Sequence, residues 1–418
     1  LAFPTETVVG RIPLEQVSLH AEQECKAYPS MRFRGSPDAI TRVARQLAKA
    51  RRPVLIVGGG ANHSQARGEI LALAERLQAP VVTTISGQGI MPDQHPLALG
   101  VIGDNGYHPH AVRAVEGGDV LLYIGCKMGS VSTVKWTLPS TRAGRKILQV
   151  DINPRIIGNT FQVDEAVVGD ARLVLEDVLV ELGKARRRGD ESWVEELNLD
   201  RRRFWDQAAA VLASEETPLS PQRVIGSLNR ALPEPAVVVA DAGTATPYVT
   251  RYLRLNHSRS RFIIPRAYGG LGYAIPGVLG AWLARPEARP VGLFGDGSMG
   301  MSCGELETLL RYDVPAVLIH FNNGSFGWIK TLQKIHSESR YLSVDFKPLD
   351  MSKVASAFGL RAFRVETPAQ LEKSLAEAFA SKGPCFIDIL SRPIEEKIPP
   401  VYSWLKECGI DPLSKEPY

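Results

Sequence analysis

The sequence predicts an α/β protein built from two doubly wound parallel-sheet domains. Short runs of apolar residues alternate with amphipathic helical segments in two successive blocks, and a charged stretch separates the blocks. Strands that are apolar throughout, with helices between them, are typical of a parallel sheet covered on both faces. The length agrees, because 418 residues correspond to two or three domains of ordinary size.

The first block is expected to span residues 36–184. Ser36 and Pro37 have the features of a helix start, an N-cap residue followed by proline at the first helical position. Apolar residues then recur at helical spacing, at Ile40, Val43, Ala44, Leu47 and Ala48. The strands expected in this block are residues 53–57, 81–83, 120–124, 147–150 and 166–168.

The second block is expected to span residues 216–392. The linker before it, residues 185–215, is expected to be helical from Ser192 to Leu212. A basic run at residues 184–188 is offset at once by acidic residues, which favours a solvated linker. Residues 393–418 form a C-terminal tail. The strands expected in the second block are residues 236–240, 291–294, 316–321 and 385–389.

The composition excludes several classes of protein. Lys and Arg number 49 against 45 Asp and Glu, and the resulting net charge of +4 is too small to indicate nucleic-acid binding. No apolar run reaches the roughly 18 residues that a membrane-spanning helix needs. The 5 cysteines are widely spaced without a CxxC pair. They therefore indicate neither a disulfide framework nor a zinc site, and they favour a cytoplasmic location.

Two loops of the second block carry the residues best suited to chemistry. Gly295-Asp296-Gly297 follows the strand at 291–294, and Asn322-Asn323-Gly324 follows the next strand. Ligands of an open parallel sheet bind outside the carboxyl ends of its strands, so the carboxylate and the amide are expected to lie side by side. A small set of oxygen ligands suits Mg²⁺, which takes its other ligands from phosphate and water.

These two loops, with 24 residues between them, resemble the diphosphate–magnesium motif of thiamine diphosphate enzymes. The segment from Gly270 to Pro276 resembles the one that lies under the cofactor in that family. Residues 36–184 resemble the family's middle domain, for example through Pro80-Val81-Val82-Thr83-Thr84 and Asp151-Ile152-Asn153-Pro154. The resemblance covers nearly the whole chain and points to the acetolactate synthase and benzoylformate decarboxylase group.

The resemblance implies roles for individual residues. Asp296 and Asn323 bind Mg²⁺ through side-chain oxygens, and Ser325 binds it through its backbone carbonyl. Leu271 is the apolar fulcrum that bends the cofactor, and the carbonyl of Gly269 accepts a hydrogen bond from the cofactor's 4′-amino group. The residues implied around the diphosphate are Gly243, Thr244, Gly295, Gly297, Ser298 and Met299. The residues expected near the substrate are Phe326, Trp328 and Leu332.

The implied activity is cleavage or ligation of a small 2-oxo acid, by an acetolactate synthase-like transferase or by a decarboxylase (a lyase). In the family the cofactor's ylid adds to the 2-oxo acid, CO2 leaves, and an enamine is protonated or adds to an acceptor. In the family the glutamate that activates the cofactor belongs to an N-terminal pyrimidine-binding domain, and this domain is expected to lie outside the present sequence.

Residues 1–35 are accordingly expected to be the end of that missing domain plus a linker, with Leu1–Thr7 as its last strand. The missing domain is expected on the rest of a longer chain or on a partner chain, and the chain alone is expected to be inactive. The resemblance also implies a homodimer or a homotetramer.

Several assignments have a structural alternative. Asp296 is also suited to be a helix N-cap, and Leu271 to be ordinary core. Phe326 and Trp328 fit a substrate pocket and a cap on the sheet equally well.

Two motifs in the first block have alternatives as well. Gly58-Gly59-Gly60 fits a dinucleotide-binding turn and a tight turn into a helix about equally well. His108 and His110 suggest a metal site, but no third ligand stands nearby in the sequence. A loop with two solvated histidines is therefore favoured.

Two departures from the acetolactate synthase pattern bear on the substrate. Residues 127–131 lack the arginine that grips the carboxylate of the acceptor 2-oxo acid in those enzymes. Leu332 replaces the tryptophan that shapes their acceptor pocket. Both changes weaken a literal acetolactate synthase assignment. The lost arginine and the glycine triplet also argue against FAD in the first block.

Three hypotheses follow, in order of preference. The first is a thiamine diphosphate enzyme in its full-length form. The second is a non-catalytic or regulatory subunit that binds the cofactor but lacks the glutamate. It predicts that the coding sequence upstream of Leu1 encodes no pyrimidine-binding domain, which distinguishes it from the first hypothesis. The third is a flavin or nicotinamide protein that uses the first block only. An absorbance spectrum of the purified protein without a flavin band would count against this hypothesis.

Overall fold

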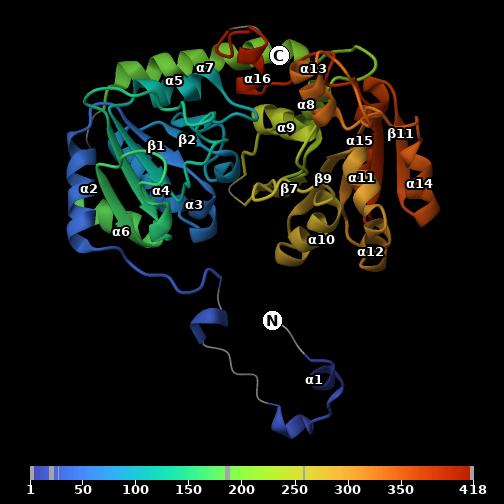
Figure 1. The fold of residues 1–418 in the computed structure, drawn as a ribbon, viewed down its shortest axis with the longest axis horizontal. Coiled ribbons are helices and arrows are strands. Elements are labelled where there is room, and N and C mark those ends of the chain that lie inside the picture. Colours follow the sequence, from blue (N-terminus) through green and yellow to red (C-terminus); the bar gives the residue numbers. More distant parts are fainter. Residues whose placement is uncertain (1–3, 18–22, 27, 184–188, 258, 415–418) are drawn as a thin grey trace. The chain divides into compact units, whose positions relative to one another are not determined.

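Two six-stranded parallel sheets form the framework of the chain (Figure 1). The computed structural model describes residues 4–17, 23–26, 28–183, 189–257 and 259–414. Contacts divide the chain into two units, residues 1–33 and 34–418, and both sheets belong to the second unit. The predicted α/β class with two doubly wound sheets is confirmed. Among the described residues, no helix combines the length and apolar character of a membrane span.

The first unit consists of short helical pieces. They are α1 (Thr5–Val9) and two 3-10 turns, η1 (Leu14–Gln16) and η2 (Gln23–Lys26). The strand predicted for the first seven residues is therefore wrong from Thr5 onward, and residues 1–3 lie outside the described part. Pro4 favours a helix start after it, because its fixed φ suits the residue that opens a helix.

The first sheet has the strand order β3-β2-β1-β4-β5-β6, and every neighbouring pair is parallel. Its strands are β1 (Pro53–Val57), β2 (Val81–Thr83), β3 (Ala98–Val101), β4 (Val120–Ile124), β5 (Lys146–Asp151) and β6 (Glu165–Val168). Its helices are α2 (Pro37–Lys49), α3 (Gly59–Ser64), α4 (Arg67–Leu77), α5 (Pro109–Gly117), α6 (Ala171–Glu181) and α7 (Glu191–Leu212), with turns η3 (Ile85–Gly87) and η4 (Pro154–Ile156).

Alternate residues of the strands point into two different cores. Leu55 and Val57 of β1 pack with α2, α4 and α6 on one face. Val54 and Ile56 pack with α5 and α7 on the other face. This covering of both faces explains why the strands are apolar at every position. The linker helix was predicted to within one residue of α7, and the basic run at residues 184–188 lies outside the described part.

The second sheet has the order β11-β12-β10-β9-β7-β8 and is also parallel throughout. Its strands are β7 (Ala236–Ala240), β8 (Arg261–Ile263), β9 (Arg289–Gly295), β10 (Val317–Asn322), β11 (Arg361–Val365) and β12 (Cys385–Leu390). Its helices are α8 (Pro221–Ala231), α9 (Ala245–Tyr252), α10 (Ala274–Ala284), α11 (Asp296–Ser302), α12 (Glu305–Arg311), α13 (Gly327–His336), α14 (Met351–Phe358), α15 (Pro368–Ala380) and α16 (Tyr402–Glu407).

Three strands of the structure were not predicted: β3, β8 and β11. All three lie at an edge of their sheet. An edge strand contacts one neighbour only and is short or partly exposed, so it lacks the continuous apolar run by which the central strands were found. In addition, Gly100 with φ +82° interrupts the apolar run of β3, and two arginines interrupt that of β11.

Candidate active site

Three adjacent strands of the second sheet deliver the candidate site. In the order β10-β9-β7, their carboxyl ends lead into Asn323–Ser325, into Asp296 and into Asp241–Thr244. A cavity of about 280 Å³ opens among these loops. The carboxyl edge of an open parallel sheet is the place where such a cavity is expected.

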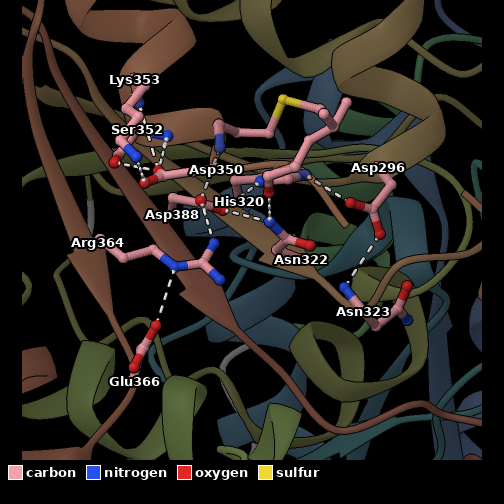
Figure 2. Close-up of polar contacts among 12 residues, drawn as sticks. Asp296, His320, Asn322, Asn323, Asp350, Ser352, Lys353, Arg364, Glu366 and Asp388 are labelled. Carbon is pink, nitrogen blue, oxygen red and sulfur yellow. Dashed lines mark hydrogen bonds and ion pairs between the residues drawn. The ribbon is translucent and has the colours of Figure 1, made fainter. Parts of the chain in front are cut away.

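Asp296 and Asn323 meet across the ends of β9 and β10 (Figure 2). Asp296 is buried and is the first residue of α11. Its Oδ2 accepts hydrogen bonds from the backbone N–H of Asn323 at 3.0 Å and of Ser325 at 3.4 Å. Oδ1 of Asn323 lies 3.3 Å from the same Ser325 nitrogen. The carboxylate oxygen of Asp296 and the amide oxygen of Asn323 therefore converge. Asp296 is more than a helix N-cap, because its side chain accepts hydrogen bonds from the neighbouring loop.

A buried histidine stands behind Asp296 (Figure 2). Nε2 of His320 lies 3.4 Å from Oδ1 of Asp296, and its Nδ1 lies 2.9 Å from Oδ1 of Asp388. His320 and Asp388 are both fully buried. The imidazole thus bridges two carboxylates, one at the cavity and one in the sheet interior.

Asp388 is held by several further donors. Its oxygens accept hydrogen bonds from the Asn322 side chain at 3.0 Å, from the Met351 N–H at 2.9 Å and from the guanidinium of Arg364. Burial raises the pKa of Asp388, but His320, Asn322 and Arg364 outweigh burial and hold that pKa below its usual value. Burial likewise lowers the pKa of His320, yet the two carboxylates overcome this effect and raise the pKa.

A second buried carboxylate holds the loop on the opposite side of the cavity. Asp241 follows β7 and accepts hydrogen bonds from the N–H groups of residues 272–274, at 3.2, 2.8 and 3.0 Å. The turn that carries Leu271 is thereby tied to the end of β7. Burial raises the pKa of Asp241, and hydrogen bonds from this turn and from Ser298 offset only part of the effect.

Sequence reasoning missed His320, Asp388 and Asp241 as parts of the site. His320 and Asp388 each interrupt an otherwise apolar strand, which is the one signal in the sequence that sets them apart. Nothing in the sequence indicates which partners they have.

Glycines in the site loops are required by the backbone or by packing. Gly243 has φ +110° and Gly269 has φ +64°, a region that side chains other than glycine rarely adopt. A Cβ on Gly297 would lie 2.3 Å from the ring of Phe326. The motif glycines therefore keep the loops close to one another.

Most of the predicted site residues line the cavity. Asn323 stands beside it, with a side-chain Nδ2 that is buried and has no hydrogen-bond partner within the described part of the chain. Met299 lies in the hydrophobic core, 1% exposed, and Leu332 is not among the residues of the cavity wall. The predicted residues on the wall are Gly243, Thr244, Gly269, Leu271, Gly295, Asp296, Gly297, Ser298, Ser325, Phe326 and Trp328.

The aromatic pair and the C-terminal tail complete one wall. Phe326 and Trp328 both line the cavity. The ring of Trp328 packs against Trp404 of α16, with 4.3 Å between the ring centroids. Lys330 forms an ion pair with Glu395 of the tail at 3.0 Å. The tail therefore packs behind the cavity wall.

The two motifs of the first block have structural explanations. Gly58-Gly59-Gly60 forms a tight turn into α3, and a Cβ on Gly58 would lie 2.3 Å from the carbonyl oxygen of Gly125. The predicted solvated loop around the histidines is wrong, because His108 and His110 are 6% and 1% exposed. His108 packs edge-on against Phe204 of α7, at 5.0 Å. No group of three or more His, Cys, Asp or Glu in the described residues is placed to hold a metal.

Two family models match the chain. One, described as "Thiamine pyrophosphate enzyme, central domain", matches residues 40–178, and these contain the first sheet. The other, described as "Thiamine pyrophosphate enzyme, C-terminal TPP binding domain", matches residues 241–389, and these contain the candidate site.

Several curated proteins are similar over most of the chain. A probable acetolactate synthase large subunit of Methanocaldococcus jannaschii is 30% identical over 99% of this chain and 71% of its own length. A probable sulfoacetaldehyde acetyltransferase of Rhizobium meliloti is 30% identical over 84% of the chain and 62% of its own length. A pyruvate oxidase of Lactiplantibacillus plantarum is 28% identical over 90% of the chain and 66% of its own length. The chain thus spans only part of each relative.

Proposed function

The chain belongs to the thiamine pyrophosphate enzyme family, and from that premise we propose that it is the diphosphate-binding part of an enzyme that cleaves or forms a carbon–carbon bond beside the carbonyl of a 2-oxo acid. One observation carries this proposal: the oxygens of Asp296 and Asn323 converge at the edge of a cavity that Leu271 and Gly269 line.

The donors at this point fit Mg²⁺. Asp296 offers a carboxylate, Asn323 an amide oxygen and Ser325 a backbone carbonyl, which are oxygen ligands of the kind that Mg²⁺ prefers. The hydrogen bonds to Asp296 leave lone pairs free on its oxygens. Three protein ligands leave room for phosphate oxygens and water, so the set suits a metal that binds together with a diphosphate.

The rest of the cavity wall fits thiamine diphosphate. Bound there, the cofactor would supply a carbon nucleophile and an acceptor for the electrons of the broken bond. Thr244 and Ser298 lie at the ends of adjacent strands, where their N–H and hydroxyl groups are suited to hold the diphosphate. Leu271 offers an apolar contact, and the Gly269 carbonyl offers an acceptor for an amino group.

The proposed substrate is a 2-oxo acid, in a decarboxylation or in a ligation to a second carbonyl compound. The names of the relatives support this class, since one of them is a pyruvate oxidase and pyruvate is a 2-oxo acid. The proposal includes a cytoplasmic homodimer or homotetramer, and the five free cysteines of the chain fit a reducing compartment. It also includes a pyrimidine-binding domain outside this chain, which supplies the activating glutamate.

Calorimetry on the 418-residue chain tests the proposal. The wild type should bind thiamine diphosphate in the presence of Mg²⁺, and EDTA should abolish the binding. Asp296→Ala should weaken the binding at least about tenfold, since it removes a charged metal ligand. Glu307→Ala is the matched control, because it makes the same change in charge on the exposed face of α12. Equal affinity of the wild type and Asp296→Ala would overturn the site.

A further inference from the structure

The wall of the candidate cavity carries a cation that the proposed cofactor site does not use. Arg266 and Asp296 are the two charged residues among the described residues of this wall. Arg266 lies between β8 and α10, three positions before Gly269. Asp296 is assigned to the metal, so the guanidinium of Arg266 needs a separate explanation.

Arg266 is unpaired among the described residues. Within the part of the chain that the structure describes, it makes no hydrogen bond and no ion pair, although most of its surface is buried. The carboxylate that acts on it electrostatically is Asp104. The two oxygens of Asp104 already accept hydrogen bonds from the N–H and the hydroxyl of Ser403, at 2.7 and 2.9 Å. Burial lowers the pKa of Arg266, as expected for a cation without a close anion.

Arg266 is half-buried, and it lines the cavity without an anion bound to it in the described residues. A partly desolvated guanidinium of this kind favours an anion at that place. Its planar pair of N–H groups matches a carboxylate or a similar oxyanion. Two anions enter the proposed site, the diphosphate of the cofactor and an acidic group of the substrate. Thr244, Ser298 and the metal ligands account for the diphosphate. Arg266 stands three positions before Gly269, so the two lie within about 11 Å of each other, and both line the cavity. Gly269 is the residue whose carbonyl is proposed to accept a hydrogen bond from the cofactor's 4′-amino group.

We propose that Arg266 binds a second acidic group of the substrate, so that the site takes a 2-oxo acid with an additional carboxylate or comparable oxyanion. This inference rests on the proposed function. The carboxylate that leaves as CO2 loses its charge in the transition state, so an arginine bound to it would stabilise the ground state and slow the reaction. A second acidic group keeps its charge throughout and can be held without that penalty.

The inference also bears on the arginine missing from residues 127–131. The acetolactate synthase pattern places an anion-binding arginine there, on the first sheet, and this chain has none. Arg266 supplies a cation to the cavity from the second sheet instead. A different position of the cation implies a different placement of the acidic group and therefore a different substrate.

The experiment compares two probes that differ only in the second carboxylate, 2-oxoglutarate and 2-oxopentanoate. Binding of each to the full chain, loaded with Mg²⁺ and thiamine diphosphate, is measured by calorimetry for the wild type, Arg266→Leu and Arg266→Lys. Arg259→Leu is the matched control, because it removes the same charge from an exposed position outside the cavity. Unfolding midpoints show whether each variant folds.

In the wild type, 2-oxoglutarate should bind more tightly than 2-oxopentanoate. Arg266→Leu should raise the Kd of 2-oxoglutarate about 10- to 100-fold, the effect of losing hydrogen bonds to a charged group. The Kd of 2-oxopentanoate and of thiamine diphosphate should not change, and Arg266→Lys should recover part of the loss.

Three results would overturn the inference alone. The wild type could bind both probes equally, or Arg266→Leu could bind 2-oxoglutarate as tightly as the wild type does; in both cases the proposed function stands. Alternatively, Arg266→Leu could lose affinity for thiamine diphosphate, which would assign the guanidinium to the diphosphate. A wild type that binds no thiamine diphosphate refutes the proposed function itself, and the inference with it.

Discussion

Asp296 is oriented by a chain of buried polar side chains. Nε2 of His320 makes no hydrogen bond within the described residues, and it lies 3.4 Å from Oδ1 of Asp296, at ion-pair distance. The other nitrogen of the ring is anchored on Asp388, which is itself fixed by Arg364. Partners behind a metal ligand commonly set its orientation and its affinity for the metal. His320 therefore belongs to the proposed metal site although it does not line the cavity.

Replacement of His320 tests this positioning role. His320→Asn should leave Asp296 without its contact and raise the Kd of Mg²⁺, measured through Mg²⁺-dependent binding of thiamine diphosphate, by about 10- to 100-fold. His320→Gln, which keeps a donor on a longer side chain, should lose less. His336→Asn changes a mostly exposed histidine on α13 and serves as the control. An unchanged Mg²⁺ affinity in a folded His320→Asn would show that Asp296 is oriented by its backbone contacts alone.

At the scale of elements, one carboxylate joins two loops of the site. Asp241 accepts three successive N–H groups where α10 begins, which satisfies donors that a helix start leaves unpaired. The same hydrogen bonds position the turn with Leu271 and Gly269. The start of α10 and the turn that lines the cavity are therefore tied to the end of β7 by one side chain.

Asp241→Ala should remove this link. Unfolding by urea should show a loss of about 1–3 kcal/mol in the free energy of unfolding, because buried donors are left without an acceptor. Amide exchange should become faster at residues 272–274. Asp164→Ala provides the comparison, since it removes an exposed pairing with Lys146, and such pairs contribute about 1 kcal/mol or less. Unchanged exchange at residues 272–274 would contradict the role given to Asp241.

At the scale of the whole second unit, a neutral histidine connects the two sheets. Nδ1 of His108 accepts a hydrogen bond from the N–H of Val101 in β3, at 3.0 Å. Its Nε2 donates to the carbonyl of Arg251 in α9, at 2.8 Å. Arg251 in turn donates to the carbonyl of Tyr107 at 2.7 Å. Both ring nitrogens are thus satisfied when the ring carries one proton, because Nδ1 faces the N–H donor of Val101 and Nε2 faces the carbonyl of Arg251.

This contact predicts a dependence of stability on pH. Burial, together with the charge of Arg251, lowers the pKa of His108 to about 3, whereas the unfolded chain takes up the proton near pH 6.5. The unfolded state therefore binds more protons between these values, and stability falls as the pH drops below about 6.5. The contribution of His108 to this slope is up to about 1.4 kcal/mol per pH unit.

Urea unfolding between pH 5 and 7.5 measures the slope. His108→Gln should make it shallower, while His257→Gln, an exchange at a residue outside the core, should leave it unchanged. A slope that is the same in His108→Gln and in the wild type would show that the folded protein tolerates the charged ring.

The central strands were predictable because a strand that is buried on both faces is apolar at every position. Val54 and Leu55 point to opposite cores, so both must be apolar, and a strand of such residues is recognisable without its neighbours. The loops at Asp296 and Asn323 were predictable for a related reason: each follows a recognisable strand directly. Three of the four edge strands (β3, β8 and β11) and the burial of His108 and His110 could not be recognised in this way, because they depend on neighbours elsewhere in the chain.

The amino-acid sequence alone determined the two parallel sheets and the loops that bear Asp296 and Asn323, since both follow from short runs of residues. Only the tertiary structure decided how those loops are supported. His320 bonds to a residue 68 positions away and His108 to one 143 positions away, and Arg266 lines the cavity of the second sheet. Pairing between distant segments is set by how strands are ordered in a sheet, and no local pattern specifies that order.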